Sequence, residues 1–438
     1  MSAAPLLERI AAAHARVAPR LAGGPSWERR RRNALERLLV RGLPQRRDEN
    51  WKYLDHARLG AYSAEPAAAA AATDLPALPP LPLASMRRVT LQDGRLEPAL
   101  CDAPEDGVEV EDIAGLLAGD PAAALGFLRA PGDDADDRYA LLADAFTGSG
   151  ALIRVAAGAA PAAPVCLTHL ATAAAPGTHH ARLSIELGPG ATLVLVERFA
   201  TAGAAAVLGN LAAELSLGRG ASLVHVRLHQ QGAAAAQVET WVAHQEAGSR
   251  YEQHVFATGG SILRSNLRLA LAGEAAACRL LGLFAVEDER QVDLYTRVTH
   301  EAPATRTEQE YRGIARDRGR GAFNGRIVVE AAARGADASQ SSRNLLLSPL
   351  AEINARPQLE IHVDDVRCRH GATVGSLDEA QLFYLRSRGL DAAAATALLT
   401  WAFCADLIGR LPLPELRAAM QARFAAALPD RALLAGPA

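Results

Sequence analysis

The sequence predicts a mainly β protein whose centre is a solenoid of stacked strands, with helical regions at both ends. Three observations support this prediction. Residues 224–229 alternate apolar and polar side chains, which is the period of a β-strand. Glycine-containing turns recur through the middle of the chain at a nearly constant spacing. Apolar residues at helical spacing, with capping signals, mark both ends.

Composition excludes several classes of protein. The chain has 438 residues, half of them hydrophobic, so a large core is within reach. A net charge of -3 gives no positive field for nucleic acid. No apolar run approaches the roughly 20 residues that cross a membrane, and no secretion signal opens the chain. Five cysteines without a close pair favour free thiols in a reducing cytoplasm. We therefore expect a cytoplasmic protein that binds neither nucleic acid nor membrane.

The N-terminal part divides into two regions. The first region, residues 1–85, is predicted to be helical to about residue 60, with Gly42 and Pro44 ending the main helix. An Ala/Pro-rich connector is predicted over 61–85. Residues 86–150 form a mixed transition segment that ends in a short amphipathic helix at 137–147.

The core is predicted over 151–375. Its turns contain Gly190, Gly220, Gly248 and Gly273, which are 30, 28 and 25 residues apart. A period of this size is typical of a solenoid, because one layer cannot bury both of its faces and stacked layers can. The alternative is a β-sandwich, whose hairpins are more often spaced about 8 to 12 residues. Four histidines of these repeats are expected on the solvent face: His225, His229, His244 and His254.

The C-terminal region, 376–438, is predicted to form three short amphipathic helices. Ser376 and Glu379 match a capping box, and Gly389 suits the residue after a helix. Asp391 is expected to cap a second helix, and a third is expected over 415–428. Four residues are predicted to share one face of the second helix: Leu398, Leu399, Phe403 and Leu407.

Cys368 and His370 are the residues most suited to chemistry. If 360–370 is a strand, both lie on one face with His362 and Asp364, because strand side chains alternate. Arg367 and Arg369 would then occupy the other face, where they could lower the thiol pKa. Two ligands are fewer than the four that structural zinc or an Fe–S cluster usually takes. A metal site here would be transient or shared with a second chain, and the other interpretation is a buried Cys beside a hydrogen-bonded His.

Two other motifs give little evidence of function. Asp364 and Asp365 are adjacent, so a strand would direct them to opposite faces and they would not form an acid/base pair. The Gly319-Arg320-Gly321 turn lacks the Lys-Ser/Thr of a phosphate loop.

The surrounding residues resemble a known family. The segment 364–379, which includes His370-Gly371-Ala372-Thr373, is similar to the SufB/SufD family of iron–sulfur cluster assembly proteins, and to its SufD branch most closely. Segments 382–389, 319–327 and 344–348 also match, as do Gly42-Leu43-Pro44 and 49–53 near the start. The strong similarity covers about 290–390, and the departures are Leu54 and Arg369.

The resemblance implies a right-handed parallel β-helix and a non-catalytic scaffold subunit of a cytosolic complex. Its partners would be a SufB-like paralogue, paired through the β-helices, and a SufC-like ABC ATPase. His370 and Cys368 would lie at the SufB–SufD interface, where an Fe–S cluster is held transiently and shared with SufB, and not by the isolated chain. The C-terminal helical domain would be the docking site for SufC, with these candidate contacts: Leu382, Phe383, Tyr384, Leu399 and Phe403.

Two alternatives stay open. A β-helix enzyme acting on polysaccharide would need a carboxylate cluster on one solenoid face and usually a secretion signal, and neither is visible in the sequence. The SufB paralogue itself would be favoured if the isolated chain held a cluster alone. The sequence also leaves open whether the isolated chain forms a homodimer.

Overall fold

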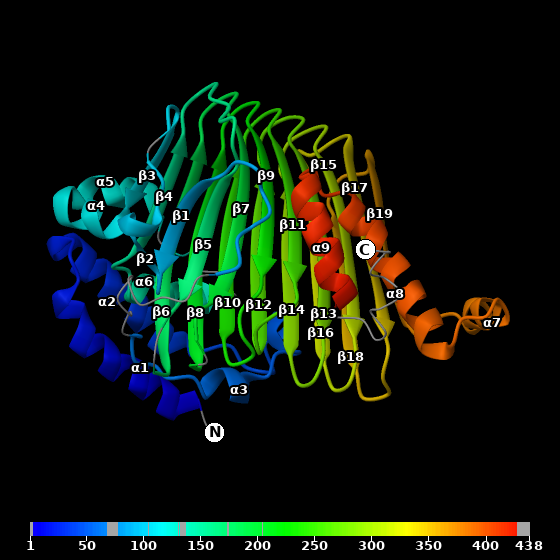
Figure 1. The fold of residues 1–438 in the computed structure, drawn as a ribbon. Coiled ribbons are helices and arrows are strands. Elements are labelled where there is room, and N and C mark those ends of the chain that lie inside the picture. The colour runs from blue at the N-terminus through cyan, green and yellow to red at the C-terminus, as the bar shows by residue number, and fades with distance from the viewer. Residues whose placement is uncertain are drawn as a thin grey trace.

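Two β-sheets, built from strands that alternate along the chain, form the centre of the molecule (Figure 1). The computed structural model describes residues 3–426, except 68–77, 104, 130, 132–136, 173–174 and 204. Much of the predicted connector and the end of the third C-terminal helix therefore lie outside the described residues. The strands form a solenoid of about seven turns, flanked by helices at both ends, which confirms the predicted fold class.

Each turn of the solenoid places one strand in each sheet. The ten-stranded sheet has the order β19-β17-β15-β13-β11-β9-β7-β5-β1-β2, and the nine-stranded sheet has the order β18-β16-β14-β12-β10-β8-β6-β4-β3. Neighbouring strands are parallel and in register, except for the antiparallel pairs β1–β2 and β3–β4 at one end. The strands are β1 (Arg87–Gln92), β2 (Arg95–Leu96), β3 (Val108–Asp112), β4 (Gly150–Val155), β5 (Val165–Ala171), β6 (Gly177–Leu187), β7 (Thr192–Thr201), β8 (Val207–Leu217), β9 (Ser222–His229), β10 (Ala236–Gln245), β11 (Arg250–Ala257), β12 (Ile262–Leu271), β13 (Ala277–Val286), β14 (Gln291–His300), β15 (Arg306–Ala315), β16 (Arg320–Val329), β17 (Ala336–Leu346), β18 (Glu352–Ile361) and β19 (Val366–Gly375).

The turns along one rim of the solenoid share one backbone conformation and one hydrogen bond. One residue per turn has a left-handed φ of 56 to 72°, and its N–H donates to a carbonyl of the next turn, as Gly220 does to Ala247 O at 2.9 Å. These residues are Gly158, Gly190, Gly220, Gly248, Ala275, Ala304 and Gly335. Gly273 was wrongly aligned with this set. It lies two residues before Ala275, the left-handed residue of that turn. A Cβ at Gly273 would meet Ala247 N at 1.9 Å.

The alternation of the strands was predicted correctly, but the faces were reversed. His225 and His229 are fully buried in the lumen between the sheets, and His254 is also buried. Only His244 of the predicted surface set is partly exposed. Val226 and Leu228 point outward instead, into an apolar cluster shared with C-terminal helices. Because those helices cover the outer face of the ten-stranded sheet, apolar side chains are favoured on both of its faces.

The N-terminal helices cover the outer face of the nine-stranded sheet. They are α1 (Ala3–Val17), α2 (Gly24–Arg41), α3 (His56–Gly60), α4 (Ile113–Gly119), α5 (Pro121–Phe127) and α6 (Arg138–Ala145). The short helix η2 (Glu49–Trp51) lies in the N-terminal segment 49–53, which resembles the SufB/SufD family. Trp51 is fully buried, with the Arg264 guanidinium 4.2 Å from its ring, and the Asp55 N–H donates to Gln291 at 2.9 Å. Residues 51–55 therefore anchor the N-terminal region to β12 and β14.

The C-terminal helices are α7 (Glu379–Ser387), α8 (Ala392–Gly409) and α9 (Pro414–Ala426). Asp378, and not Ser376, caps α7 by accepting from the N–H groups of Ala380 and Gln381. Asp391 caps α8 as predicted, and Gly389 has the left-handed φ expected after a helix.

The buried face of α8 agrees with the predicted one only in part, at Leu407. It contains Cys404, Leu407 and Ile408, which pack on the ten-stranded sheet, whereas Leu398 is exposed. By length and composition α8 is long and apolar enough to cross a membrane, contrary to the expectation from the sequence. Its contacts with the sheet account for part of this apolar character.

Candidate functional site

β19 is the last strand of the ten-stranded sheet, and its second edge is unpaired among the described residues (Figure 1). It pairs only with β17, which sets Ala338 beside Cys368 and Gln340 beside His370. β18 is the corresponding last strand of the other sheet and pairs only with β16. The solenoid therefore ends in two strands that retain unpaired backbone N–H and C=O groups.

Cys368 faces inward from β19 and is half-buried. It packs on an apolar cluster that includes Ile327, Val329 and Ala336. Burial raises the pKa of the Cys368 thiol above its ordinary value, Asp337 raises it further, and a hydrogen bond with the Ala338 backbone lowers it. The expected lowering by Arg367 and Arg369 was wrong, because both arginines lie on the opposite face of the strand.

His370 lies on the same face as Cys368, as predicted, and it is exposed. Its side chain makes no hydrogen bond or ion pair with any described residue, so it is available to a group outside this chain. Behind it, the Gln340 amide donates to Gln309 at 3.4 Å, and Gln309 accepts from Thr296 at 2.8 Å. This chain of hydrogen-bonded, buried polar side chains lies beneath His370.

His362 and Asp364 do not join the pair. β18 ends at Ile361 and β19 starts at Val366, so residues 362–365 form a turn and not the continuous strand that was expected. His362 instead pairs with Glu360 at 3.1 Å. In the described part of the chain, no group of three or more His, Cys, Asp or Glu residues is placed to hold a metal ion. Cys368 and His370 are thus two candidate ligands without a third.

The predicted docking residues fall on two helices with different surroundings. α7 stands away from the body of the molecule (Figure 1), and Phe383 and Tyr384 on it are 73% and 56% exposed. Leu382 is also on α7. Leu399 and Phe403 are half-buried on α8, where the Phe403 carbonyl accepts from Arg312 at 2.6 Å.

Sequence reasoning missed a buried charged network inside the solenoid. Glu197 accepts from Arg227 at 2.9 Å and pairs with His169 and His225 at 2.8 and 3.2 Å. Arg227 also pairs with Glu239. Burial by itself would raise the pKa of Glu197, but Arg227 and the two histidines hold it well below its ordinary value. Charged residues within otherwise apolar strands, such as Glu197-Arg198 between Val196 and Phe199, were the available signal.

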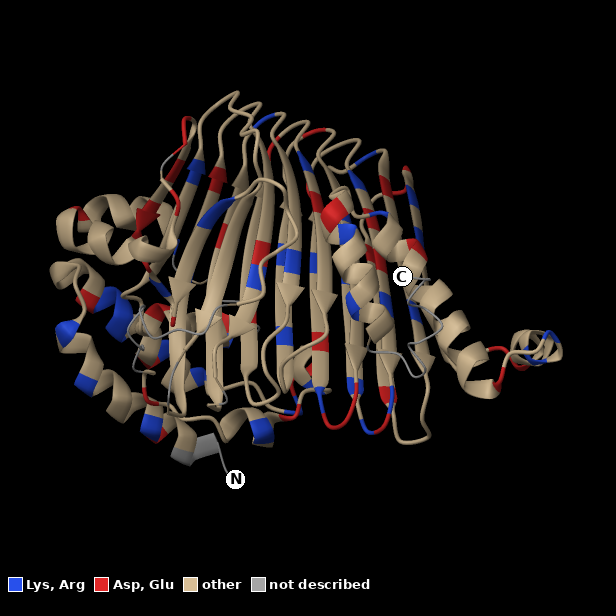
Figure 2. Ribbon diagram, viewed as in Figure 1, with Lys and Arg blue, Asp and Glu red and all other residues tan. Residues whose placement is uncertain are grey.

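Figure 2 shows acidic and basic residues interspersed over the strands and rims of the visible face. The near-neutral net charge of -3 agrees with this pattern.

Comparison with known proteins identifies a family by similarity. The SufBD core domain of the SUF system for FeS cluster assembly matches residues 169–403. The iron–sulfur cluster assembly protein SufD of Escherichia coli is 33% identical over 410 residues, which cover 91% of this chain and 92% of that protein. An iron–sulfur cluster assembly SufBD family protein of Synechocystis is 26% identical over 89% of this chain and 88% of its own length. The chloroplastic protein ABCI7 of Arabidopsis thaliana is 33% identical over 47% of this chain and 43% of its own length.

Proposed function

Because this chain belongs to the SufB/SufD family of iron–sulfur cluster assembly proteins, we propose that it is a non-catalytic scaffold subunit of a SufB–SufC–SufD complex. In this proposal the chain acts as the SufD partner and pairs with a SufB-like paralogue through the open end of its solenoid. Cys368 and His370 would contribute two ligands to a site that the paralogue completes. The cluster is the cargo of this site.

The unpaired edge of β19 is the observation that carries the proposal. The opposite end of the solenoid finishes in the antiparallel strands β2 and β3 and is accompanied by α4 and α5 (Figure 1). The open end has no comparable cover among the described residues, and it exposes Ile361, Val374 and Leu350. An exposed strand edge with apolar side chains favours addition of a strand from another chain.

The chemistry of the pair fits a shared and transient cluster. A cluster usually takes four ligands, and this chain offers two neighbouring candidates at the open end. The raised pKa of Cys368 keeps it a thiol in the free chain, so that binding iron would release its proton. The isolated chain is therefore expected to hold no cluster.

A second part of the proposal concerns SufC. The exposed aromatic pair on α7, Phe383 and Tyr384, suits an apolar groove on a SufC-like ABC ATPase, since aromatic anchors are common hot spots of interfaces. In this proposal the ATPase activity resides in that partner. We also place the complex in the cytoplasm, where the five free cysteines would stay reduced.

The cluster proposal is tested by anaerobic reconstitution of the purified three-component complex, followed by absorption and electron paramagnetic resonance spectroscopy. His370→Ala and Cys368→Ala should each lower the cluster yield by about tenfold or more, as expected for loss of a metal-site group. His362→Ala is the matched control, because this histidine is exposed in the adjoining turn and should leave the yield unchanged. Wild-type yield from the His370→Ala complex would remove His370 from the mechanism.

The docking proposal is tested by retention of the SufC-like ATPase on the immobilised chain. The double variant Phe383→Ala/Tyr384→Ala should lose about 2 kcal/mol or more of binding free energy. Val40→Ala, which alters an exposed apolar residue of α2, should retain the ATPase normally. Unchanged retention by the double variant would contradict docking at α7. Point variants are preferable to deletion, because removing α8 and α9 would uncover the apolar face of the sheet.

A further inference from the structure

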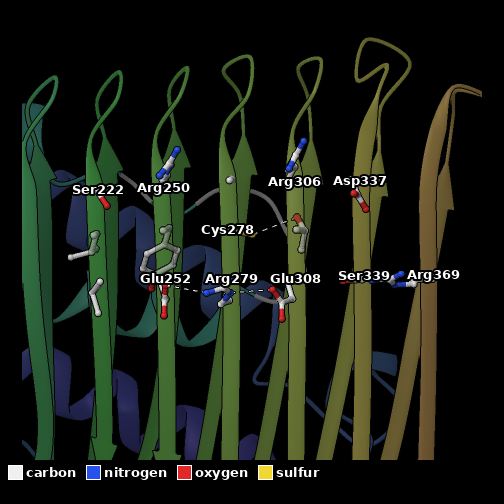
Figure 3. Close-up of a pocket in the computed structure, with 15 residues that line it drawn as sticks. Ser222, Arg250, Glu252, Cys278, Arg279, Arg306, Glu308, Asp337, Ser339 and Arg369 are labelled. Atoms are coloured by element: carbon white, nitrogen blue, oxygen red, sulfur yellow. Dashed lines mark hydrogen bonds and ion pairs between the residues drawn. The ribbon is translucent and has the colours of Figure 1, made fainter. Parts of the chain in front are cut away.

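A groove of about 600 Å³ lies on the outer face of the ten-stranded sheet, near the starts of its strands. It extends across β9, β11, β13, β15, β17 and β19 (Figure 3). The registers align its side chains in two rows that run across the strands. This face is opposite to the one that carries Cys368 and His370, so the groove is distinct from the proposed cluster site.

In the lower row, which contains Glu252, Arg279 and Glu308, the charges of the side chains neutralise one another. Arg279 pairs with Glu308 at 3.1 Å and with Glu252 at 3.6 Å (Figure 3). Arg410, which follows α8, adds a second contact to Glu308 at 3.3 Å, and buried His254 lies 2.8 Å from Glu252. Both carboxylates of this row therefore have basic partners.

The upper row contains positive charges without partners. It places Arg250, Ala277 and Arg306 on three successive strands. Within the described part of the chain, the side chains of Arg250 and Arg306 make no hydrogen bond or ion pair, and both arginines are exposed. Asp337 is the next residue in this row, yet it forms no ion pair with Arg306 among the described residues.

The spacing of the two arginines suits a single anionic group. Strands stack about 4.8 Å apart, so Arg250 and Arg306 start roughly 9.6 Å apart, on either side of Ala277. Only a methyl group occupies the position between them, which leaves room for a ligand above β13. A guanidinium binds phosphate oxygens in a bidentate manner, and a phosphate monoester carries nearly two negative charges, which matches two arginines better than one carboxylate would.

We propose that this groove binds the phosphoryl group of a phosphorylated small molecule between Arg250 and Arg306, over Ala277. The groove volume falls within the range of small-molecule sites. Arg369, at the far end of the lower row, offers a further positive charge to a ligand that extends along the groove. Free phosphate and a nucleotide phosphate share this chemistry, and the test separates them.

The test is isothermal titration calorimetry of the purified full chain with inorganic phosphate, pyrophosphate and ADP in separate titrations. At least one should bind saturably with a Kd of about 1 mM or tighter. Tighter binding of ADP than of pyrophosphate would indicate a nucleotide, and equal binding would indicate the phosphoryl groups alone. Arg250→Gln and Arg306→Gln should each weaken binding about tenfold. Ala277→Glu should abolish anion binding, because it puts a negative charge between the two arginines and leaves both of them in place.

The control is Arg318→Gln, which changes an exposed arginine at the opposite rim that has no side-chain partner among the described residues. It should leave the Kd unchanged. Equal weakening by Arg318→Gln would show general charge attraction and overturn the site. Absence of saturable binding by all three anions would overturn it as well. Neither result depends on cluster assembly, so failure here leaves the proposed function intact.

Discussion

At the scale of single residues, alternation along a strand was enough to place Cys368 and His370 on one face. The same rule could not give the electrostatics of the thiol. Asp337, which raises the Cys368 pKa, is 31 positions earlier in the sequence and becomes a neighbour only when β17 pairs with β19. Burial by Ile327 and Val329 likewise comes from an adjacent turn. The sequence thus identified the two candidate ligands, but it could not predict the residues that surround them in the fold.

The raised pKa of Cys368 makes a prediction about alkylation. The rate of iodoacetamide modification at Cys368 should keep rising above the pH at which an ordinary thiol, with a pKa of about 8.5, has levelled off. Asp337→Asn removes one cause of the shift and should move the profile to lower pH. Site-resolved mass spectrometry measures both. Buried Cys278, whose pKa is raised to about 12, is the internal reference and should stay unmodified. A Cys368 profile at or below the ordinary value would contradict this description.

At the scale of elements, the period of the turns was visible in the sequence but its phase was not. Glycine marks the left-handed position in some turns, whereas Ala275 and Ala304 occupy it in others, so glycine spacing alone misplaced one turn. The faces of β9 were also assigned in reverse, because the helices that cover Val226 and Leu228 are about 180 residues later in the sequence. The prediction of Ser376 as a cap failed more simply, since Asp378 competes for the same helix start.

The left-handed rim positions predict opposite effects for two substitutions. Gly220→Ala introduces a Cβ at a φ of 68° and should lower the free energy of unfolding by about 1 kcal/mol. Ala304→Gly relieves a φ of 56° and should raise it by several tenths to about 1 kcal/mol. Urea denaturation measures both. A loss of stability in both variants would show that the two positions are not equivalent.

At the scale of the whole molecule, the solenoid buries histidines that must stay neutral. Burial lowers the pKa of His180 to about 3 and that of His300 to about 4. His180 pairs with Asn210 at 3.0 Å, and His300 lies between the hydroxyls of Thr305 and Thr307. An unfolded histidine has a pKa near 6.5, so at acid pH the unfolded chain binds protons that the folded chain excludes.

Stability should therefore be greatest above about pH 6.5 and should fall as the pH drops toward 4. His300 alone accounts for about 3 kcal/mol between pH 8 and pH 4. The free energy of unfolding, measured across this range for wild type and His300→Gln, should fall less steeply in the variant. Identical slopes for the two proteins would contradict this role of His300.

The two ends of the solenoid also differ, because one end is covered and the other leaves strand edges unpaired among the described residues. Family resemblance in the sequence predicted the partner that would use the open end, but only the strand order shows that β18 and β19 lack neighbours among the described residues. This asymmetry is the reason for proposing that Cys368 and His370 are half of a site, because their strand lies where the next turn of a solenoid would stack.

The most direct test of that claim is hydrogen–deuterium exchange of residues 366–375, measured for the chain alone and in complex with its SufB-like partner. We predict that the amides on the free edge of β19 exchange quickly in the isolated chain and are strongly protected in the complex, whereas β10 in the middle of the solenoid is equally protected in both. A chain that is monomeric when isolated, forms the complex and yet shows unchanged exchange in β19 would contradict the account.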